Sequence, residues 1–352
     1  MTMSIIICDD STVARNQMRA ALPDDWDVEV SLAHHGGEAM DLLREGKGEV
    51  LFLDLNMPVL DGYQTLEAIR SESLSSIVIV VSGDVQPEAH RRVMSLGALA
   101  FIEKPAAPLD LVDLLNTYGL YSAPTSSTIE PETPVSVPET PQVTSIDGIG
   151  RVAEIPANLL RDGMQEVANV AMGRSADLLA RLLKVFVKLP IPNVNLLEVN
   201  ELKMALSLAS EGATYSAVCQ GFIGAGIAGE ALLIFDDSSF SDIAQLMQRS
   251  EANTREAELE LLMDLSSILT GSCISGVGQQ LDVHFSLGHP MVLGQHVSIE
   301  HLVGDNTHRW SQTLAIEITY HIENYNITCD LLLLFTEDSI GDIEQRLAYL
   351  FN

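Results

Sequence analysis

Residues 49–54 read EVLFLD, an apolar run that ends in a carboxylate at Asp54. A short, uninterrupted run of this kind is typical of a buried strand. Residues 4–10, SIIICDD, repeat the pattern, with β-branched residues followed by Asp9 and Asp10. If both runs are strands of one parallel sheet, their acidic residues lie at the same edge.

Strand-like and helix-like segments alternate through residues 1–120, which we take as the first domain. Ser11 is predicted to cap the first helix, and Pro87 stands in the first turn of the fourth. Five such units predict a doubly wound (βα)5 fold, a parallel sheet with helices on both faces. The expected strands are residues 4–8, 27–33, 49–54, 76–83 and 98–104, and the expected helices are 11–22, 36–46, 62–73, 87–97 and 108–119.

The overall composition excludes several classes of protein. The chain has 352 residues, 47% of them hydrophobic, and a net charge of −30. It can build two or three domains, but it repels phosphate backbones and anionic membranes, so we expect no nucleic-acid and no membrane partner. No apolar run approaches the ~18 residues of a membrane helix, and no targeting segment is visible. Cysteines without a C-x-x-C pair indicate reduced thiols in a cytoplasmic protein.

Further polar residues stand at the ends of the expected strands. Ser82 ends the fourth strand and Lys104 ends the fifth. The carboxylates of Asp9, Asp10 and Asp54 repel one another unless a divalent cation neutralises them, and Mg²⁺ prefers such oxygen ligands. A metal-bound carboxylate beside a lysine and a hydroxyl can accept a phosphoryl group, because the two cations neutralise its oxygens.

This set of residues resembles the receiver domain of two-component response regulators, over residues 3–119. The resemblance implies Mg²⁺ as cofactor, a sensor histidine kinase as partner and a cis peptide bond before Pro105. Asn56 follows Asp54 by two residues, and Asp84 follows Ser82 by two residues. An amide and an acid at these positions are similar to those of the single-domain chemotaxis regulator CheY. The resemblance implies that Asp54 is the phosphoacceptor, that Asp9, Asp10 and Asp54 hold the metal, that Ser82, Lys104 and Phe101 sense the phosphoryl group, and that Asn56 and Asp84 tune its lifetime.

Residues 121–150 separate this domain from a second one. Their central part is rich in Pro, Thr and Ser and has no basic residue, which predicts a flexible linker. Residues 151–352 form the second domain, in which halves of about 155–250 and 253–352 repeat one another. We expect an α/β domain with long helices on a largely antiparallel sheet and a hairpin across Asn324.

The repeat is clearest in two helical segments. The first carries an acid and an amide on one helical face, at Asp162, Glu166, Asn169 and Gly173. The second carries Glu260, Asp264, Ser267 and Gly271 at the same spacing, 98 residues later. The acid and the amide lie off the expected core stripe of Met164, Val167, Ala168, Ala171, Leu178 and Leu182. That face therefore points at solvent or at a partner.

The spacing from Asp162 through Glu166 and Asn169 to Pro192 resembles the signature of CheC-type chemotaxis phosphatases, the family of CheC, CheX and FliY. That family dephosphorylates phosphorylated CheY, and it carries the signature on two related halves. The resemblance, over residues 155–352, implies that Asn169 orients the attacking water and that Glu166 contacts the lysine of the substrate receiver. An amide suits this role because it can orient water without taking a proton.

The second half departs from this signature. Asp264 replaces the Glu, and Ser267, which is shorter and has no amide, replaces the Asn. We expect a degenerate second site there, weak or inactive. The basic residues that follow the first motif, Arg174, Arg181, Lys184 and Lys188, are expected to be solvated or else to steer an acidic receiver onto the helix.

The sequence leaves more than one output open. The leading interpretation is a phosphatase for the phospho-aspartate of a CheY-like receiver, controlled by phosphorylation of Asp54. A separate receiver is favoured over its own, because a regulatory receiver must keep its phosphoryl group long enough to signal. The alternatives are a sink that hydrolyses its own Asp54 phosphate, and a non-catalytic adaptor that binds a receiver or a CheD-type partner. Transcriptional output is disfavoured by the acidic charge and by the lack of a helix-turn-helix signal.

Overall fold

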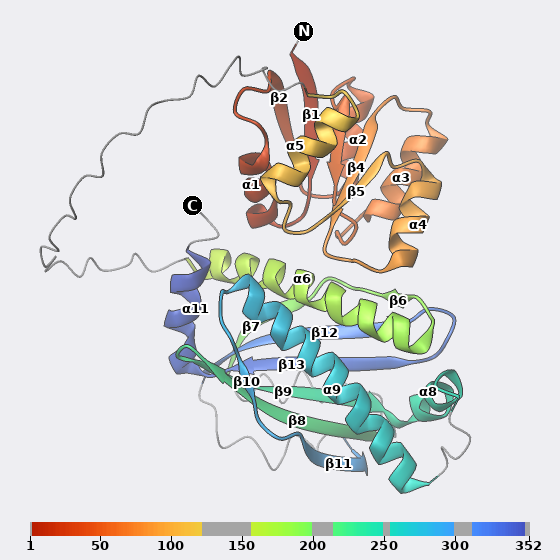
Figure 1. Cartoon of the computed structure of the whole chain (residues 1–352), viewed down its shortest axis with the longest axis vertical. Coiled ribbons are helices and arrows are strands. Elements are labelled where there is room, and N and C mark those ends of the chain that lie inside the picture. The colour runs from red at the N-terminus through yellow and green to blue at the C-terminus, as the bar shows by residue number, and fades with distance from the viewer. Residues whose placement is uncertain (1, 122–155, 199–213, 249–253, 299–311, 349–352) are drawn as a thin grey trace, which may run out of the picture.

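Two sheets with their own helices make up the part of the chain that is described (Figure 1). The computed structural model describes residues 2–121, 156–198, 214–248, 254–298 and 312–348. We call residues 2–121 the N-terminal unit and the remaining ranges the C-terminal unit. Except for Tyr121, the linker expected at residues 121–150 lies outside the described residues.

The N-terminal unit is the doubly wound parallel sheet that the sequence predicts. Its strands lie in the order β2-β1-β3-β4-β5, and every adjacent pair is parallel. Apolar clusters cover both faces, which is why the strands are uninterrupted apolar runs. The elements are β1 (Met3–Cys8), α1 (Thr12–Ala21), β2 (Val28–Ala33), α2 (Gly36–Arg44), β3 (Val50–Leu53), α3 (Gly62–Ser71), β4 (Ile77–Ser82), α4 (Pro87–Leu96), β5 (Ala100–Glu103) and α5 (Pro108–Thr117).

Local signals in the sequence set the ends of these elements. The Ser11 side chain accepts a hydrogen bond from the Ala14 N–H and caps α1, as predicted. Pro87 occupies the first turn of α4. The peptide bond between Lys104 and Pro105, just after β5, is cis.

The C-terminal unit is an antiparallel sheet covered by two long helices. The main path of the sheet is β10-β8-β9-β13-β12-β6, with β11 on β8 and β7 on β12. The hairpin expected across Asn324 joins β12 to β13. The elements are α6 (Ala157–Leu183), β6 (Val187–Lys188), β7 (Asn193–Glu198), β8 (Tyr215–Gly224), β9 (Ile227–Asp236), η1 (Asp237–Ser239), α8 (Phe240–Leu246), α9 (Arg255–Gln280), β10 (Ser286–Leu287), β11 (Met291–Val297), β12 (Gln312–Ile322), β13 (Thr328–Phe335), η3 (Glu337–Ser339) and α11 (Ile340–Leu347).

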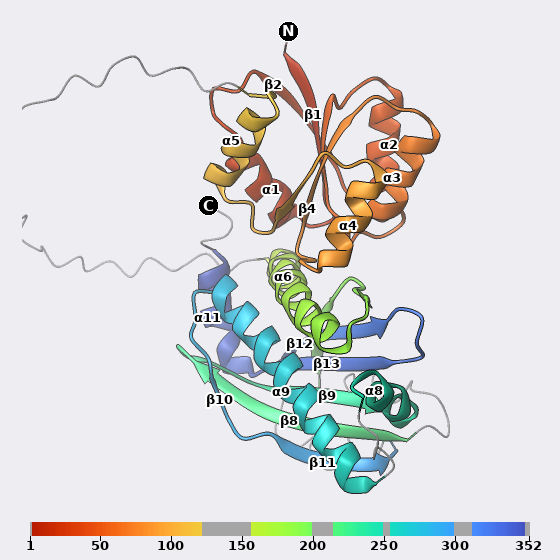
Figure 2. The same ribbon diagram turned by 45° about the vertical axis from the view of Figure 1, so that its right-hand side comes forward.

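The long helices α6 and α9 come from the two motif segments, and both pack on one face of this sheet (Figure 2). The predicted core stripe of α6 is correct for Met164, Val167, Ala168 and Ala171 but wrong for Leu178 and Leu182, which are exposed. The helices cross near Ala171, where Gly276 of α9 makes close contact. Toward the C-terminal end of α6, Leu179 and Leu183 are buried in the core of the C-terminal unit instead.

Helix α9 is apolar enough, by length and composition alone, to cross a membrane. Polar residues interrupt its sequence, so it contains no uninterrupted apolar run of membrane-spanning length. Most of its apolar window is buried, including Leu262, Leu265 and Leu269 in the core of the C-terminal unit. Helix α9 is thus buried as a core helix is. It is the single helix among the described residues that is long and apolar enough to cross a membrane.

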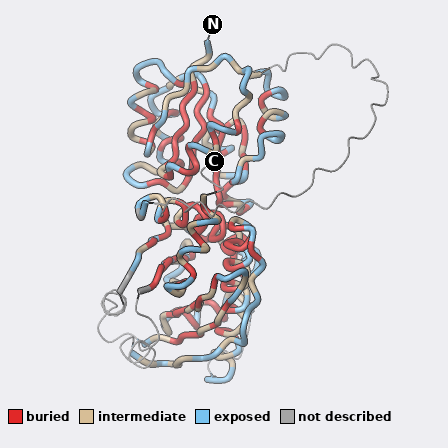
Figure 3. Tube along the Cα trace, turned by 90° about the vertical axis from the view of Figure 1, so that its left-hand side faces the viewer, coloured by how far each residue is buried: buried red, intermediate tan, exposed pale blue. Residues whose placement is uncertain are grey.

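Helix α6 also lies along the N-terminal unit, so that it separates the two sheets (Figure 1). The tube coloured by burial shows buried residues along this junction (Figure 3). One face of α6 therefore packs on its own sheet, and another faces the carboxyl ends of the parallel strands.

Candidate functional site

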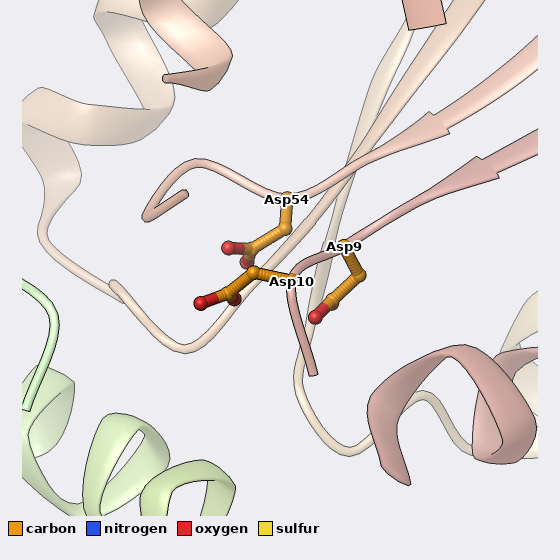
Figure 4. Close-up of side chains that lie close together, drawn as sticks. All are labelled: Asp9, Asp10 and Asp54. Atoms are coloured by element: carbon orange, nitrogen blue, oxygen red, sulfur yellow. The ribbon is translucent and has the colours of Figure 1, made fainter. Parts of the chain in front are cut away.

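Three carboxylates gather at the carboxyl ends of β1 and β3 (Figure 4). Asp9 and Asp10 follow β1 and Asp54 follows β3, and these neighbouring parallel strands end at one edge of the sheet. One oxygen from each carboxylate lies within 4.8 Å of the others. Backbone N–H groups hold the two buried members: Ser11 donates to Asp9 at 2.9 Å, and Asn56 donates to Asp54 at 2.8 Å.

Lys104 reaches this cluster from the end of β5. Its Nζ atom lies 2.7 Å from Asp9 Oδ2 and 3.1 Å from Asp54 Oδ1. Burial lowers the pKa of Lys104, but the surrounding carboxylates, Asp54 foremost, outweigh this and raise it well above its ordinary value. Burial raises the pKa of Asp9 to about 8 and that of Asp10 to about 7. The lysine is thus a fixed positive charge among crowded acids.

The face of α6 that carries Glu166 and Asn169 lies against this cluster. Glu166 Oε1 is 3.3 Å from Lys104 Nζ, and Asn169 Oδ1 accepts a hydrogen bond from Asn56 Nδ2 at 3.4 Å. Glu166 is 8% exposed and Asn169 is 5% exposed. Burial raises the pKa of Glu166. Of the two surroundings expected for this face, solvent or a partner, it has the second, and the partner is the N-terminal unit of the same chain.

The two remaining residues of the stripe also meet the N-terminal unit. The Asp162 carboxylate accepts hydrogen bonds from the backbone N–H groups of Thr12 and Val13, both at 3.3 Å. A carboxylate is favourable there because it lies at the N-terminus of α1. Gly173 lies so close to Gly83 that a Cβ atom on Gly173 would overlap the Gly83 carbonyl oxygen. All four residues of the stripe therefore belong to one surface of α6 that contacts the N-terminal unit.

The cluster has the donor set of a magnesium site. Three carboxylates, of Asp9, Asp54 and Glu166, contact one lysine, and the Asp10 carboxylate lies beside them. This excess of negative charge favours a divalent cation. Aspartate oxygens are the ligands that Mg²⁺ prefers, so Asp9, Asp10 and Asp54 fit this ion. A cavity of about 20 Å³ beside Asp54, Lys104 and Glu166 has room for about one water molecule.

The other predicted residues of the N-terminal unit lie around this centre. Ser82 is buried, and its Oγ accepts a hydrogen bond from the Asp84 N–H at 3.1 Å. Asp84 accepts from the backbone and side chain of Gln86 at 3.1 and 3.0 Å, and burial raises its pKa to about 6. Phe101 is half-buried and packs edge-on to His90, with ring centroids 5.5 Å apart. Their roles in sensing and tuning stay predictions.

The second half presents a different surface at the matching positions of α9. Ser267 is exposed, and its Oγ donates to the Met263 carbonyl of its own helix at 2.8 Å. Asp264 is half-buried. A Cβ atom on Gly271 would meet no heavy atom within 4 Å, in contrast to Gly173. The surface around Ser267 and Gly271 is thus open where its counterpart on α6 is covered.

Sequence reasoning missed a second region of contact between the units. Gln86 pairs with the backbone of Val187, and Arg92 pairs with Glu323. These partners are 101 and 231 residues apart in the chain, and no local pattern marks them. Of the basic residues after the α6 motif, Arg181 pairs with Asp177 and Arg174 with Gln279, and Lys184 is exposed. Lys188 is 60% exposed and lies 3.6 Å from Glu323, the carboxylate that also pairs with Arg92.

Comparison with known proteins identifies the N-terminal unit. Residues 5–116 match the family model of the response regulator receiver domain. The protein-glutamate methylesterase/protein-glutamine glutaminase of Halalkalibacterium halodurans is 34% identical over 111 residues, which are 31% of this chain and 32% of that protein. The nitrate/nitrite response regulator protein NarL of Escherichia coli is 25% identical over 186 residues, which are 53% of this chain and 86% of that protein. The chain spans less than half the length of the methylesterases that it matches.

Two solved structures are similar to parts of this chain. The crystal structure of Thermotoga maritima FliY matches 56% of this chain and 98% of that chain, with a TM-score of 0.41 and 17% identity. The chemotaxis protein CheY4 of Vibrio cholerae matches 33% of this chain and 98% of that chain, with a TM-score of 0.31 and 25% identity. By the family match, the N-terminal unit is a receiver domain, and such a domain indicates a two-component response regulator.

Proposed function

We propose that this chain is a response regulator whose C-terminal unit hydrolyses the phospho-aspartate formed at Asp54 of its own receiver. One observation carries the proposal: Glu166 and Asn169 are buried against the phosphoacceptor pocket of the same chain, with Glu166 3.3 Å from Lys104. The sequence favoured a separate receiver as substrate. The docked arrangement instead supports the phosphate sink, which the sequence left as an alternative.

The residues present suit the hydrolysis of an acyl phosphate. A water oxygen attacks phosphorus, the bond between phosphorus and the Asp54 carboxylate oxygen breaks, and inorganic phosphate leaves with the water oxygen and one of its protons. The second proton passes to a phosphate oxygen or to solvent, and Asp54 is left as a carboxylate. Such a reaction requires mainly a water molecule held in line with phosphorus. The Asn169 amide, which lies on the Asn56 side of the pocket, has the donor and acceptor to hold that water without taking its proton.

Charged groups on both sides of the interface keep the reacting atoms in register. Lys104 stabilises negative charge on the phosphoryl oxygens, while its pairing with Glu166 fixes α6 over the pocket. Asp9, Asp10 and Asp54 would hold Mg²⁺, which supplies further neutralisation of these oxygens when bound. Ser82 lies buried at the end of β4, where its hydroxyl can donate to the same group.

The lifetime of the Asp54 phosphoryl group in full-length protein tests the proposal. Acetyl phosphate with Mg²⁺ labels the chain, the donor is removed, and the label is followed over time. Asn169→Ala should lengthen the half-life by ~100-fold or more, the scale for losing one positioned catalytic group. The wild-type half-life should not change with protein concentration, because the reaction lies within one chain. A half-life that Asn169→Ala leaves unchanged contradicts the proposal.

A second candidate function follows from the burial of Glu166 and Asn169 under the receiver. The docked receiver covers Asn169, so a separate phosphorylated receiver can reach it only when the two units part. In that case phosphorylation of Asp54 acts as a switch that uncovers α6, as the sequence interpretation preferred. Two results together would favour the switch. Turnover of an added phosphorylated CheY-like receiver would rise when Asp54 is phosphorylated, and Asn169→Ala would leave the half-life of the Asp54 phosphoryl group unchanged. The non-catalytic adaptor predicts no hydrolysis in either assay.

A further inference from the structure

The two units also touch away from Asp54, beside the N-terminus of α4. Gln86 Nε2 donates to the Val187 carbonyl at 2.8 Å, and the Val187 N–H donates to Gln86 Oε1 at 2.9 Å. The Gln86 amide thus pairs with β6 as a peptide group of a neighbouring strand would. Gln86 is 1% exposed and Val187 is fully buried, so the pair is shielded from solvent. Asp84 accepts from Gln86 Nε2 at 3.0 Å and fixes the amide in this orientation.

Arg92 makes the second part of this contact from within α4. Both terminal nitrogens of its guanidinium group donate to the Glu323 carboxylate, one of them at 3.1 Å. The same guanidinium lies over the Phe186 ring, with Cζ 4.0 Å from the ring centroid. Within its own helix, Arg92 pairs with Glu88 at 3.1 Å. A planar cation thus meets a carboxylate and an aromatic face of the C-terminal unit at once.

These residues, Gln86 and Arg92 of the receiver with Phe186, Val187 and Glu323 of the C-terminal unit, are the α4 contact. The contacts made by Glu166 and Asn169 reach Lys104 and the surroundings of Asp54, which belong to the phosphoryl chemistry itself. Every receiver that carries out this chemistry must have these groups, so contacts with them cannot distinguish one receiver from another. The α4 contact lies outside the phosphoryl chemistry, so it can distinguish one receiver from another.

We propose that the α4 contact makes the receiver of the same chain the preferred substrate of the C-terminal unit over other receivers. This inference rests on the proposed function. A receiver without an amide at the Gln86 position would leave the buried Val187 N–H and C=O unpaired, and one without a cation at the Arg92 position would leave Glu323 without its guanidinium partner. Each loss weakens docking by about tenfold or more. The α4 contact therefore selects the receiver, and Asn169 acts on whichever receiver is docked.

Charge reversal across the Arg92–Glu323 pair tests this in full-length protein. The variants are Arg92→Glu, Glu323→Arg and the double reversal. The matched control is Arg91→Glu, because Arg91 is the adjacent arginine of α4 and pairs with Glu88 while largely exposed. Each protein is assayed for the half-life of its own Asp54 phosphate and for turnover of an added phosphorylated CheY-like receiver.

Each single reversal should lengthen the half-life by about tenfold or more and should speed turnover of the added receiver. The double reversal should return both quantities toward wild type, and Arg91→Glu should change neither. A purely structural role would lower both activities together. The proposal is overturned if both activities fall without recovery in the double reversal, or if the single reversals leave both unchanged.

Failure of this inference can be told from failure of the proposed function. Hydrogen exchange at the Val187 amide reports the α4 contact without any catalysis, since this N–H donates to Gln86. If Asn169→Ala does not lengthen the half-life, the proposed function fails whatever the exchange shows. If Asn169→Ala does lengthen it, but Arg92→Glu neither speeds Val187 exchange nor alters the preference between receivers, only the present inference fails.

Discussion

Gly173 of α6 packs directly on Gly83, which follows β4 in the receiver, with no space between them for a Cβ atom. The obstruction on the receiver side is a backbone carbonyl oxygen, which cannot rotate away as a side chain could. The absence of a side chain at residue 173 thus permits α6 to approach the phosphoacceptor pocket. The matching glycine of α9, Gly271, has open space around it.

Gly173→Ala should therefore weaken docking while leaving the C-terminal unit folded. Overpacking of this kind costs about 1–3 kcal/mol, which corresponds to about tenfold or more in the docking equilibrium. The helix itself gains from the change, because alanine is a better helix former than glycine by about 1 kcal/mol. We expect a longer Asp54 phosphate half-life and a larger radius of gyration in solution scattering. Gly271→Ala is the matched control and should alter neither quantity.

The two halves of the C-terminal unit should be unequal in catalysis. Ser267 is exposed and bonded to its own helix, whereas Asn169 is buried at the receiver pocket. Ser267→Ala should therefore change the Asp54 phosphate half-life by less than about twofold, against ~100-fold for Asn169→Ala. The measurement is the decay of label in full-length protein. If Ser267→Ala is the more damaging substitution, the active half has been misassigned.

Asp54 should be the residue that carries the phosphoryl group. It is 1% exposed and lies within reach of Lys104 and of the Asp9 and Asp10 carboxylates. In an Asn169→Ala background, where the label is retained, acetyl phosphate with Mg²⁺ should label the chain, and Asp54→Asn should abolish the label. Removal of Mg²⁺ with a chelator should prevent labelling too. Equal labelling with and without Asp54 would contradict the assignment.

Much of the receiver, and the face of α6 that docks on it, could be predicted from the sequence, although the sequence favoured a separate receiver as the partner of that face. Asp54 and Lys104 stand at the ends of apolar runs, and strand ends of a parallel sheet meet at one edge whatever the details of packing. Glu166 and Asn169 share a helical face because the period of a helix is fixed. These are local rules, and the structure brings the four residues together.

The rest depends on packing between distant segments. The same helical period predicts a core position for Leu178, yet Leu178 is exposed and its neighbour Leu179 is buried in the core of the C-terminal unit. Gln86 and Arg92 find their partners more than a hundred residues away, in a contact that exists only once both units are folded. The composition of the linker likewise does not predict which receiver docks on α6, because it determines the distance that the linker can span and not how tightly a receiver binds.

A histidine in the C-terminal unit should make its stability depend on pH. His296 of β11 joins two other elements: its Nδ1 lies 2.9 Å from Asp237 Oδ2 and its Nε2 lies 3.0 Å from Glu258 Oε2. Both ring nitrogens can donate only when the imidazole is protonated. The hydrogen bond with Asp237, together with the charges of Asp237 and Glu258, raises the pKa of His296 above its ordinary value.

The sign of the effect follows from that raised pKa. The folded state holds the His296 proton more tightly than the unfolded state, so its contribution is complete below the ordinary pKa of about 6.5 and is lost as pH rises through the folded value. The side chain is 42% exposed, so solvent screening limits the contribution to roughly 1 kcal/mol. His296→Asn should thus lower stability at pH 6 and have little effect at pH 9.

The measurement is thermal unfolding of wild type and His296→Asn from pH 5.5 to 9, with hydrogen exchange to locate the change. Asparagine is chosen because His296 has a φ of 58°, a conformation that asparagine tolerates well. Exchange should quicken in β11 and in the first turns of α9, which the imidazolium joins, and not in the receiver. His289→Asn, at an exposed histidine before β11, should behave as wild type. A stability difference that stays constant across this pH range would show that His296 acts through packing and not through its charge.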